Sequence, residues 1–215
     1  MTPSGAASPV YFTVRRPLSE RERFEICLGA LLTQNTAWRN ASTALEALTA
    51  DGAVSPRKIT ALPRARLRSL IRSSGYYRQK AEKLRVFCGE LVNGRPGGIG
   101  QWFSGPLGKV REELLSIKGI GPETADSMLL YAGRRRVFVV DAYTIRLALR
   151  AGWLGCGDYH AAQKFFMDRL PRSERIYNEY HALIVELAKR YCTKSRPRCH
   201  DCPLRGLCLK KGVES

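Results

Sequence analysis

The sequence predicts an all-α protein from three observations. Apolar residues recur at helical spacing through most of the 215 residues. Residues that favour helix starts stand before several of these patterns, and the clearest is the Ser19–Glu22 capping box. Only Val137–Val140 forms a β-branched run, which is too short to build a sheet. We therefore expect many short helices joined by short connections.

The expected helices follow one another along the chain. Residues 1–16 have no apolar period, and we expect them to be flexible. Ser19 begins a helix that runs to about Gln34, and Ser55–Pro56 begins a short one, with proline where its missing N–H costs nothing. The tail beyond Arg190 again has no apolar period. The other helices are expected, in order, at 38–49, 64–74, 77–92, 108–117, 122–132, 141–152, 158–169 and 173–191.

Composition narrows the function classes. The chain has 36 Lys and Arg against 19 Asp and Glu, a formal net charge of +17. Because 44% of the residues are hydrophobic, a core can form and disorder throughout is excluded. No apolar run approaches the roughly 20 residues that span a bilayer, and the N-terminus lacks a secretory signal. We expect a soluble, cytoplasmic protein with a polyanionic partner.

The basic residues cluster in three places. They concentrate in 62–85, in 134–136 and in 190–211, and Tyr76 and Tyr77 lie within the first cluster. A solvated basic face would explain one such run. Several runs together, with aromatic residues that can stack on bases, favour a nucleic-acid surface. Binding to a membrane surface is disfavoured because no amphipathic helix joins an apolar face to the basic runs.

Four of the 7 cysteines form the most specific local pattern, Cys192-x6-Cys199-x2-Cys202-x5-Cys208. In a reducing compartment a tight cluster of cysteines indicates a metal rather than disulfides. Four thiolates can bind zinc or a [4Fe–4S] cluster. Structural zinc usually takes two C-x2-C pairs, and only one is present, so the spacing favours iron–sulfur. His200 stands between two of the ligands but is better explained as an exposed loop residue.

The segment Leu115–Ala125 predicts a hairpin between two helices. Gly119 and Gly121 flank Ile120, and a new helix starts at Pro122. Glycines permit a tight turn and let backbone N–H groups approach a phosphate closely. Such contacts position a protein on DNA without reading its sequence. A plain connection between two helices would explain the same residues equally well.

Asp141 follows the apolar run 137–140 and stands at the start of a helix. Asp is a favoured N-cap, and that alone would explain its presence. The capping position has a chemical consequence, however. Backbone N–H groups that bond to the carboxylate lower its pKa and keep it ionised. An ionised carboxylate there could stabilise a sugar cation or orient a water molecule.

The glycine hairpin, Asp141 and the four cysteines, in this order along the chain, resemble the endonuclease III-like branch of the helix-hairpin-helix DNA glycosylases. The resemblance covers about residues 20–210. It implies that the hairpin grips DNA through Lys118, Gly119, Ile120, Gly121 and Thr124, that Asp141 is catalytic, and that the cysteine tail holds a [4Fe–4S] cluster, with zinc as the alternative. It also implies that Gln34 fills the gap left by an extruded base, and that the loop with Tyr76, Tyr77 and Arg78 wedges the duplex apart.

The resemblance also implies a domain arrangement. A flexible N-terminus at 1–16 precedes a helix at 17–36 that packs with the cluster domain. A helical barrel domain follows at 37–135, with its hairpin at 117–122. Helices at 136–191 complete the cluster-side domain, and the cluster loop covers 192–208. The active site is expected in the cleft between the two domains.

Two residues depart from the family pattern. Bifunctional members carry a lysine two residues after the second hairpin glycine, and this lysine attacks the sugar before strand cleavage. Here that position is Glu123, which cannot form a Schiff base. Many members also carry a histidine two residues after the catalytic Asp, where this chain has Tyr143. Both changes resemble monofunctional relatives that remove alkylated or mismatched bases. Lys118 remains an open alternative as a nucleophile.

The resemblance therefore implies a monomeric, monofunctional glycosylase of base excision repair that acts on double-stranded DNA, at the nucleoid if the source is prokaryotic. Oxidised pyrimidine, alkylated purine and mismatched thymine all remain open as the damaged base. Two alternatives are retained. The enzyme could be bifunctional through another lysine, or the chain could be a DNA-binding iron–sulfur protein that has lost catalysis.

Overall fold

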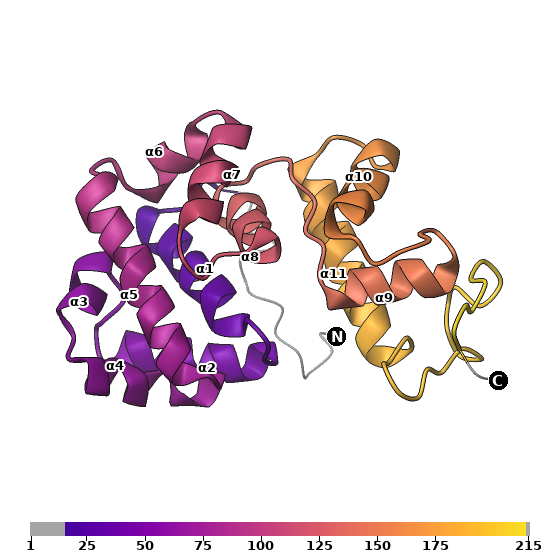
Figure 1. Ribbon diagram of the computed structural model, residues 1–215, viewed down its shortest axis with the longest axis horizontal. Coiled ribbons are helices and arrows are strands. Elements are labelled where there is room, and N and C mark those ends of the chain that lie inside the picture. The colour runs from indigo at the N-terminus through magenta and orange to yellow at the C-terminus, as the bar shows by residue number, and fades with distance from the viewer. Residues whose placement is uncertain (1–15, 214–215) are drawn as a thin grey trace. The chain divides into compact units, whose positions relative to one another are not determined.

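A computed structural model describes residues 16–213, and these residues are helical with no strand among them (Figure 1). The predicted fold class is therefore confirmed. The flexibility expected for 1–16 falls almost entirely on residues outside this range. The chain divides into two compact units, Met1–Arg135 and Arg136–Ser215. Within the described residues, no helix is long and apolar enough to cross a membrane.

The first unit is built around helix α1. Its apolar residues Phe24, Leu28 and Leu31 are buried, and α1 packs against α2, α5, α6, α8 and η3. The helices of this unit are α1 (Glu20–Thr33), α2 (Trp38–Ala50), α3 (Pro56–Ala61), α4 (Arg64–Leu70), the 3₁₀ turn η2 (Arg72–Ser74), α5 (Tyr77–Gly94), α6 (Gly98–Ser104), α7 (Leu107–Ser116), α8 (Pro122–Ser127) and the π-helical turn η3 (Met128–Ala132).

The resemblance implies that the helix at 17–36 packs with the cluster domain, and this stays a prediction. By its contacts, helix α1 belongs to the first unit. Its buried residues include Ile26 and Cys27 beside the main apolar stripe, so neighbours enclose it on several sides. Apolar spacing predicts that a helix is buried, but it does not say which helices bury it.

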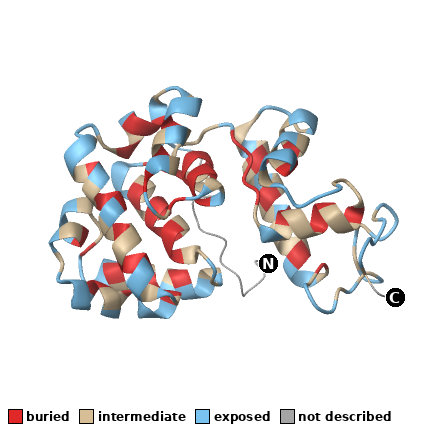
Figure 2. Cartoon of the chain, viewed as in Figure 1, coloured by how far each residue is buried: buried red, intermediate tan, exposed pale blue. Residues whose placement is uncertain are grey.

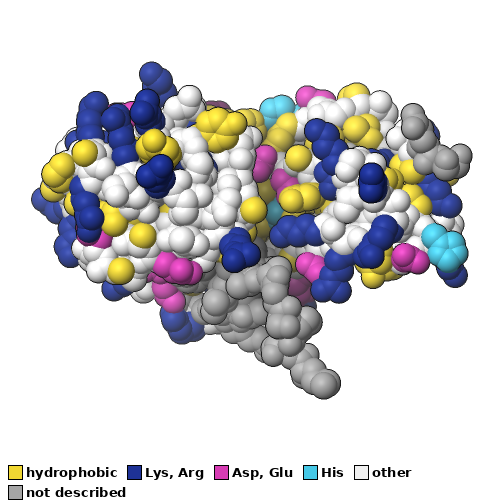
Figure 3. All heavy atoms as spheres, turned by 90° about the horizontal axis from the view of Figure 1, so that it is seen from below, with side chains coloured by type: hydrophobic (Ala, Val, Ile, Leu, Met, Phe, Trp, Pro, Cys, Tyr) yellow, Lys and Arg dark blue, Asp and Glu magenta, His cyan; other side chains and the backbone are white. Residues whose placement is uncertain are grey.

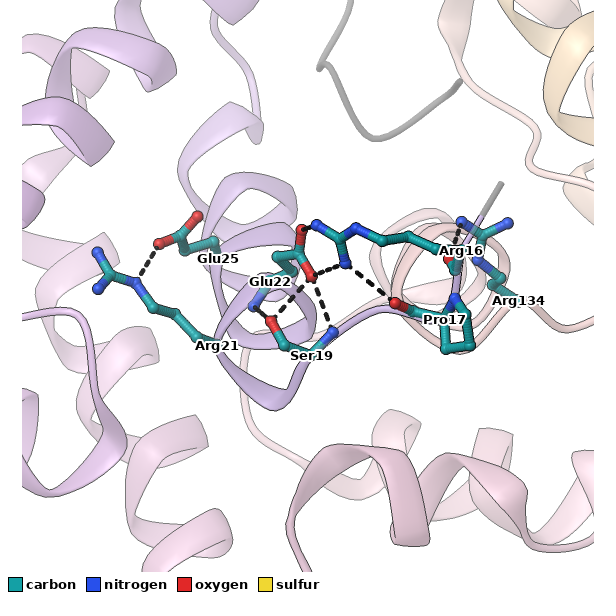
Figure 4. Close-up of polar contacts among 7 residues, drawn as sticks. All are labelled: Arg16, Pro17, Ser19, Arg21, Glu22, Glu25 and Arg134. Atoms are coloured by element: carbon teal, nitrogen blue, oxygen red, sulfur yellow. Dashed lines mark hydrogen bonds and ion pairs between the residues drawn. The ribbon is translucent and has the colours of Figure 1, made fainter. Parts of the chain in front are cut away.

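The predicted capping box starts α1 (Figure 4). The Ser19 hydroxyl accepts a hydrogen bond from the Glu22 backbone N–H, and the Glu22 carboxylate accepts one from the Ser19 N–H. Arg16 also donates to this carboxylate, at 2.6 Å. The hydrogen bond from Arg16, followed by those from Ser19, lowers the pKa of Glu22 to about 2. A charged acceptor thus stays in place at the positive end of the helix dipole.

Helix α6 is the one element of the described chain that the sequence did not predict. It begins in a Gly- and Pro-rich stretch, at Gly98 with φ +77°, and it has no local side-chain cap. Its cap is supplied from α1, because the Glu20 carboxylate accepts hydrogen bonds from the N–H groups of Ile99 and Gly100, at 2.7 and 2.8 Å. A cap that lies 79 residues away leaves no signal in the local sequence.

The second unit contains α9 (Ala142–Ala151), α10 (Tyr159–Arg169) and α11 (Glu174–Arg190), with α9 packed on α11. The run Val137–Val140 has no strand partner among the described residues and is completely buried (Figure 2). Phe138 lies in an aromatic cluster, stacked on Phe166 and edge-on to Tyr177. This packing fixes the chain that leads into Asp141.

Candidate functional site

Asp141 is the N-cap of α9, as predicted. Its Oδ1 accepts hydrogen bonds from the backbone N–H of Thr144 at 2.7 Å and from the Thr144 hydroxyl at 2.9 Å. Its Oδ2 lies 3.4 Å from Nε2 of His181 on α11. The Asp141 side chain is 14% exposed, so it is largely but not fully buried. The carboxylate is held from two helices in one orientation.

The protonation of Asp141 follows from these contacts. Burial raises the pKa of the carboxyl, but the close contact with His181 and the hydrogen bonds from Thr144 outweigh it. The net effect is a pKa below the ordinary value for Asp. A preorganised, ionised carboxylate can stabilise positive charge that develops on a bound group.

His181 is a site residue that sequence reasoning missed. It lies 40 positions from Asp141 in the chain, and only the packing of α9 on α11 brings the two together. Its ring is buried edge-on to Phe138, with the ring centroids 6.4 Å apart. The available signal was its place on the buried stripe of α11, with Tyr177 and Ile184. A histidine on an otherwise apolar stripe needs a polar partner inside the fold.

The predicted hairpin forms between α7 and α8. The N–H of Ile120 donates to the carbonyl of Ile117 at 3.0 Å, and Gly119 has φ +96°, which favours glycine. Ile120 is buried, and its N–H is already bonded within the hairpin. Lys118 and Glu123 are both exposed. The exposed carboxylate of Glu123 thus occupies the position at which bifunctional relatives are expected to carry lysine.

Gln34 is tied to this hairpin. Its Nε2 donates to the carbonyl of Gly119 at 3.1 Å and to the hydroxyl of Thr124 at 2.9 Å. Its Oε1 accepts from Nζ of Lys83 on α5 at 2.5 Å. Two predicted DNA contacts, Gln34 and Thr124, are therefore bonded to each other. The next residue, Asn35, is exposed and has φ 53°, a left-handed conformation.

The predicted wedge loop lies between η2 and α5. Tyr76 is 66% exposed and has φ 45°, which is unusual for a bulky residue. Tyr77 is half-buried, whereas Arg72 and Arg78 are exposed and have no side-chain partner within residues 16–213. An exposed aromatic ring between two unpaired cations suits contact with a nucleic acid.

The basic clusters are only partly available to a ligand, because several of their cations are paired within the protein. Lys and Arg side chains are scattered over the face drawn in Figure 3, with Asp and Glu side chains among them. Arg66 pairs with Asp51, and Arg64 and Arg68 pair with Glu82. Arg135 donates to the backbone carbonyls of Phe103 and Gly105. Some of the surplus cations therefore stabilise the fold.

The four predicted metal ligands meet at one place. Cys192, Cys199, Cys202 and Cys208 line a single cavity together with apolar residues that include Leu147. None of the cysteines forms a disulfide. In the described part of the chain, no three His, Cys, Asp or Glu side chains are arranged to hold one metal ion. His200 is exposed and bonds to Asp201, as expected for a loop residue.

Helix α9 fixes the cysteine loop. Arg146 Nε donates to the carbonyl of Cys192 at 2.7 Å. Arg150, one turn further on, donates to the Cys192 sulfur at 3.4 Å and to the carbonyls of Thr193 and Lys194. The Lys210 N–H lies 3.4 Å from the Cys208 sulfur. The same helix thus carries Asp141 at its start and holds the cysteine loop along its length.

These features define a class of protein, one with a helical fold, a glycine hairpin and a capped aspartate. The sequence profile of the HhH-GPD superfamily of base excision DNA repair proteins matches residues 28–172, and the chain belongs to this superfamily. It is an enzyme of the DNA glycosylase class and is endonuclease III-like.

Individual proteins that the chain resembles are also DNA glycosylases or share their fold. A protein of Methanocaldococcus jannaschii designated a DNA repair glycosylase, MJ1434, is 41% identical over 192 residues, which is 88% of this chain and 86% of that protein. The 3-methyladenine DNA glycosylase MagIII of H. pylori, solved with bound 1,N6-ethenoadenine, superposes with a TM-score of 0.72 at 28% identity, over 85% of this chain and 90% of that one. An endonuclease III solved in a non-covalent DNA complex shares the fold, with a TM-score of 0.76 at 24% identity, over 93% of this chain and 86% of that one.

Proposed function

We propose that this enzyme is a monofunctional DNA N-glycosylase that removes a damaged or mismatched base and leaves the abasic strand uncut. Two features of the chain together support the proposal best. Asp141 is held in place and ionised, and position 123 carries a carboxylate where bifunctional relatives are expected to carry lysine. Double-stranded DNA is the proposed partner, bound by a monomer in the cytoplasm. The hairpin backbone, Arg72 and Arg78 would contact phosphates, which positions the enzyme without selecting a sequence.

The reaction needs the target base outside the helical stack. Extrusion costs a few kcal/mol and is easiest for damaged or mispaired bases. In the proposed mechanism, Tyr76 and Gln34 occupy the space that the base leaves, which offsets part of this cost. Gln34 must first exchange its hydrogen bonds to Gly119 and Thr124 for contacts with DNA.

The chemical step is proposed to centre on Asp141. The bond between the base nitrogen and C1′ breaks, and its electron pair leaves with the base. The Asp141 carboxylate stabilises the positive charge that develops at C1′. Water then adds to C1′ and gives its proton to the carboxylate, while the departing base takes a proton from solvent. The products are a free base and an abasic site.

The substrate class is proposed from the two departures at positions 123 and 143. Both resemble relatives that act on alkylated or mismatched bases, and the similarity to a glycosylase solved with 1,N6-ethenoadenine favours a modified purine. Oxidised pyrimidine and mismatched thymine stay in the test panel as alternatives.

The cysteine loop is proposed to hold a [4Fe–4S] cluster. Four cysteines line one cavity, and their spacing, with a single C-x2-C pair, favours a cluster over zinc. When bound, such a cluster would cross-link a tail that has no apolar core of its own. Arg150 and the Lys210 N–H would then donate hydrogen bonds to ligand sulfurs.

The test is a panel of duplexes, each with one modified or mismatched base, incubated with wild-type enzyme and with Asp141→Asn. We expect the wild type to release at least one base, and the variant to release none while binding the duplex normally. Borohydride should trap no covalent enzyme–DNA adduct. An adduct that disappears in Lys118→Ala would contradict the monofunctional proposal, and normal excision by Asp141→Asn would contradict the assignment of Asp141.

A further inference from the structure

Lys80 is a buried lysine that the proposed reaction does not use. It lies in the first turns of α5 and is 2% exposed. Its Nζ donates hydrogen bonds to two backbone carbonyls, that of Leu32 at 2.7 Å and that of Ser74 at 2.6 Å. No carboxylate neutralises this ammonium group in the contacts that the structure describes.

Such burial is costly. An ammonium group loses its hydration when it is buried, and an apolar side chain of similar length would fill the space without that loss. Burial, together with the charge of the neighbouring Lys83, lowers the pKa of Lys80 to about 8. A residue retained at this cost needs a reason beyond filling the core.

The two carbonyls suggest the reason. Leu32 is in the last turn of α1, two residues before Gln34, and its carbonyl has no partner further along the helix. Ser74 ends η2, two residues before Tyr76. Lys80 therefore joins the backbones of the two segments that carry the proposed inserting residues.

Both segments contain a residue in the left-handed region. Asn35 and Tyr76 have φ values of 53° and 45°; asparagine adopts this region more readily than other non-glycine residues, whereas for tyrosine it is unusual. Such conformations persist only where the surrounding structure holds them, and they concentrate at functional sites. Lys80 binds the chain three residues before Asn35 and two before Tyr76, so it is placed to hold both.

We propose that Lys80 is a positioning residue for base extrusion, which fixes the loop of Tyr76 relative to the end of α1 so that Tyr76 and Gln34 enter the duplex together. The proposal rests on the proposed glycosylase function. Lys80 touches no reacting atom in this scheme. Its effect falls on the opening of the base pair and not on the cleavage of the glycosidic bond.

The test compares Lys80→Met with wild type on two substrates. One duplex carries the excised base opposite its normal partner, and the other carries it opposite an abasic spacer, where it is already unpaired. Lys58→Met is the matched control, because Lys58 Nζ also bonds to a backbone carbonyl, that of Gly52 at 2.8 Å, but Lys58 is exposed and has no bond to either loop.

We expect single-turnover excision by Lys80→Met to fall by about tenfold or more on the paired substrate and by less than about threefold on the unpaired one, because the cost of pair opening enters only the first. Lys58→Met should match wild type on both. An equal loss on both substrates, or no loss on either, would overturn the proposal.

Two further measurements keep the test decisive. If Lys80→Met melts below the assay temperature, Lys80→Gln, which retains a hydrogen-bond donor, is assayed in the same way and must show the same substrate dependence.

Extrusion of the base is also followed without excision, by the fluorescence of 2-aminopurine beside the target base. If wild type excises no base in the panel, the proposed function fails. The Lys80 proposal then stands if the variant gives less fluorescence increase than wild type, and falls if the two are equal.

Discussion

At the scale of single residues, the structure shows how one carboxylate can be buried and still ionised. Burial alone would favour the neutral acid, and only specific donors reverse that preference. Thr144 supplies two of these donors from the same helix turn, and His181 contacts the other oxygen from a different helix. The capping role was evident in the sequence. The histidine was not, because nothing local connects positions 141 and 181.

The His181 contact predicts a change in pH dependence. Because this contact lowers the pKa of Asp141, His181→Phe removes a lowering contribution and leaves the raising effect of burial. The carboxylate should therefore protonate at a higher pH, and the acid limb of the excision profile should move upward by about one pH unit. Excision rates measured from acid to neutral pH check this.

His160→Phe provides the control, since His160 is exposed on α10. Its acid limb should coincide with that of wild type. The lowered pKa of Asp141 also makes the stability of the fold depend on pH. A carboxyl with a lowered pKa stabilises the fold above its unfolded pKa, and this contribution is lost as the pH falls through the folded value. An unchanged acid limb in His181→Phe would show that His181 does not tune Asp141.

At the scale of elements, most helices could be predicted because their signals are local. Apolar spacing, the Ser19 cap and Pro122 at a helix start all act within one or two turns. Helix α6 could not be predicted, because its start is stabilised by Glu20 across the fold. A buried stripe likewise does not identify its neighbours, so the helices that enclose α1 are known only from the structure.

The cap on α6 predicts a local loss of stability. Glu20→Ala leaves the N–H groups of Ile99 and Gly100 without their acceptor, which should lower the free energy of unfolding by about 1 kcal/mol. Hydrogen exchange should accelerate first at these two amides. Glu112→Ala, an exposed residue of α7, should leave both quantities unchanged. Normal protection of Ile99 in Glu20→Ala would contradict the capping role.

At the scale of the whole molecule, different interactions stabilise different parts of the chain. The first unit buries an ordinary apolar core, whereas the tail beyond Arg190 is held by hydrogen bonds from Arg146 and Arg150 and places its four cysteines around one cavity. The charge surplus is likewise divided, since part of it pairs within the fold. Composition indicated the polyanionic partner, but only the structure separates the paired cations from the available ones.

The cysteine loop predicts a result of metal analysis. Purified protein should be brown and contain iron and sulfide in about equal amounts, as a [4Fe–4S] cluster requires. Cys202→Ser should lose the iron and make the chain after Arg190 sensitive to protease, whereas Cys156→Ser, at an exposed cysteine outside the set, should keep both properties. One zinc per chain without sulfide would contradict the cluster.

The hydrogen bonds of Gln34 have a consequence for the search along DNA. In the free enzyme this side chain is fully occupied by Gly119, Thr124 and Lys83. In the proposed mechanism, entry of Gln34 into a duplex must first break these bonds, each worth about 1 kcal/mol. An undamaged base pair adds the free energy of its own opening, so the enzyme should move past it without inserting Gln34. A weakened pair lowers the combined barrier, and discrimination thus begins before any base reaches a pocket.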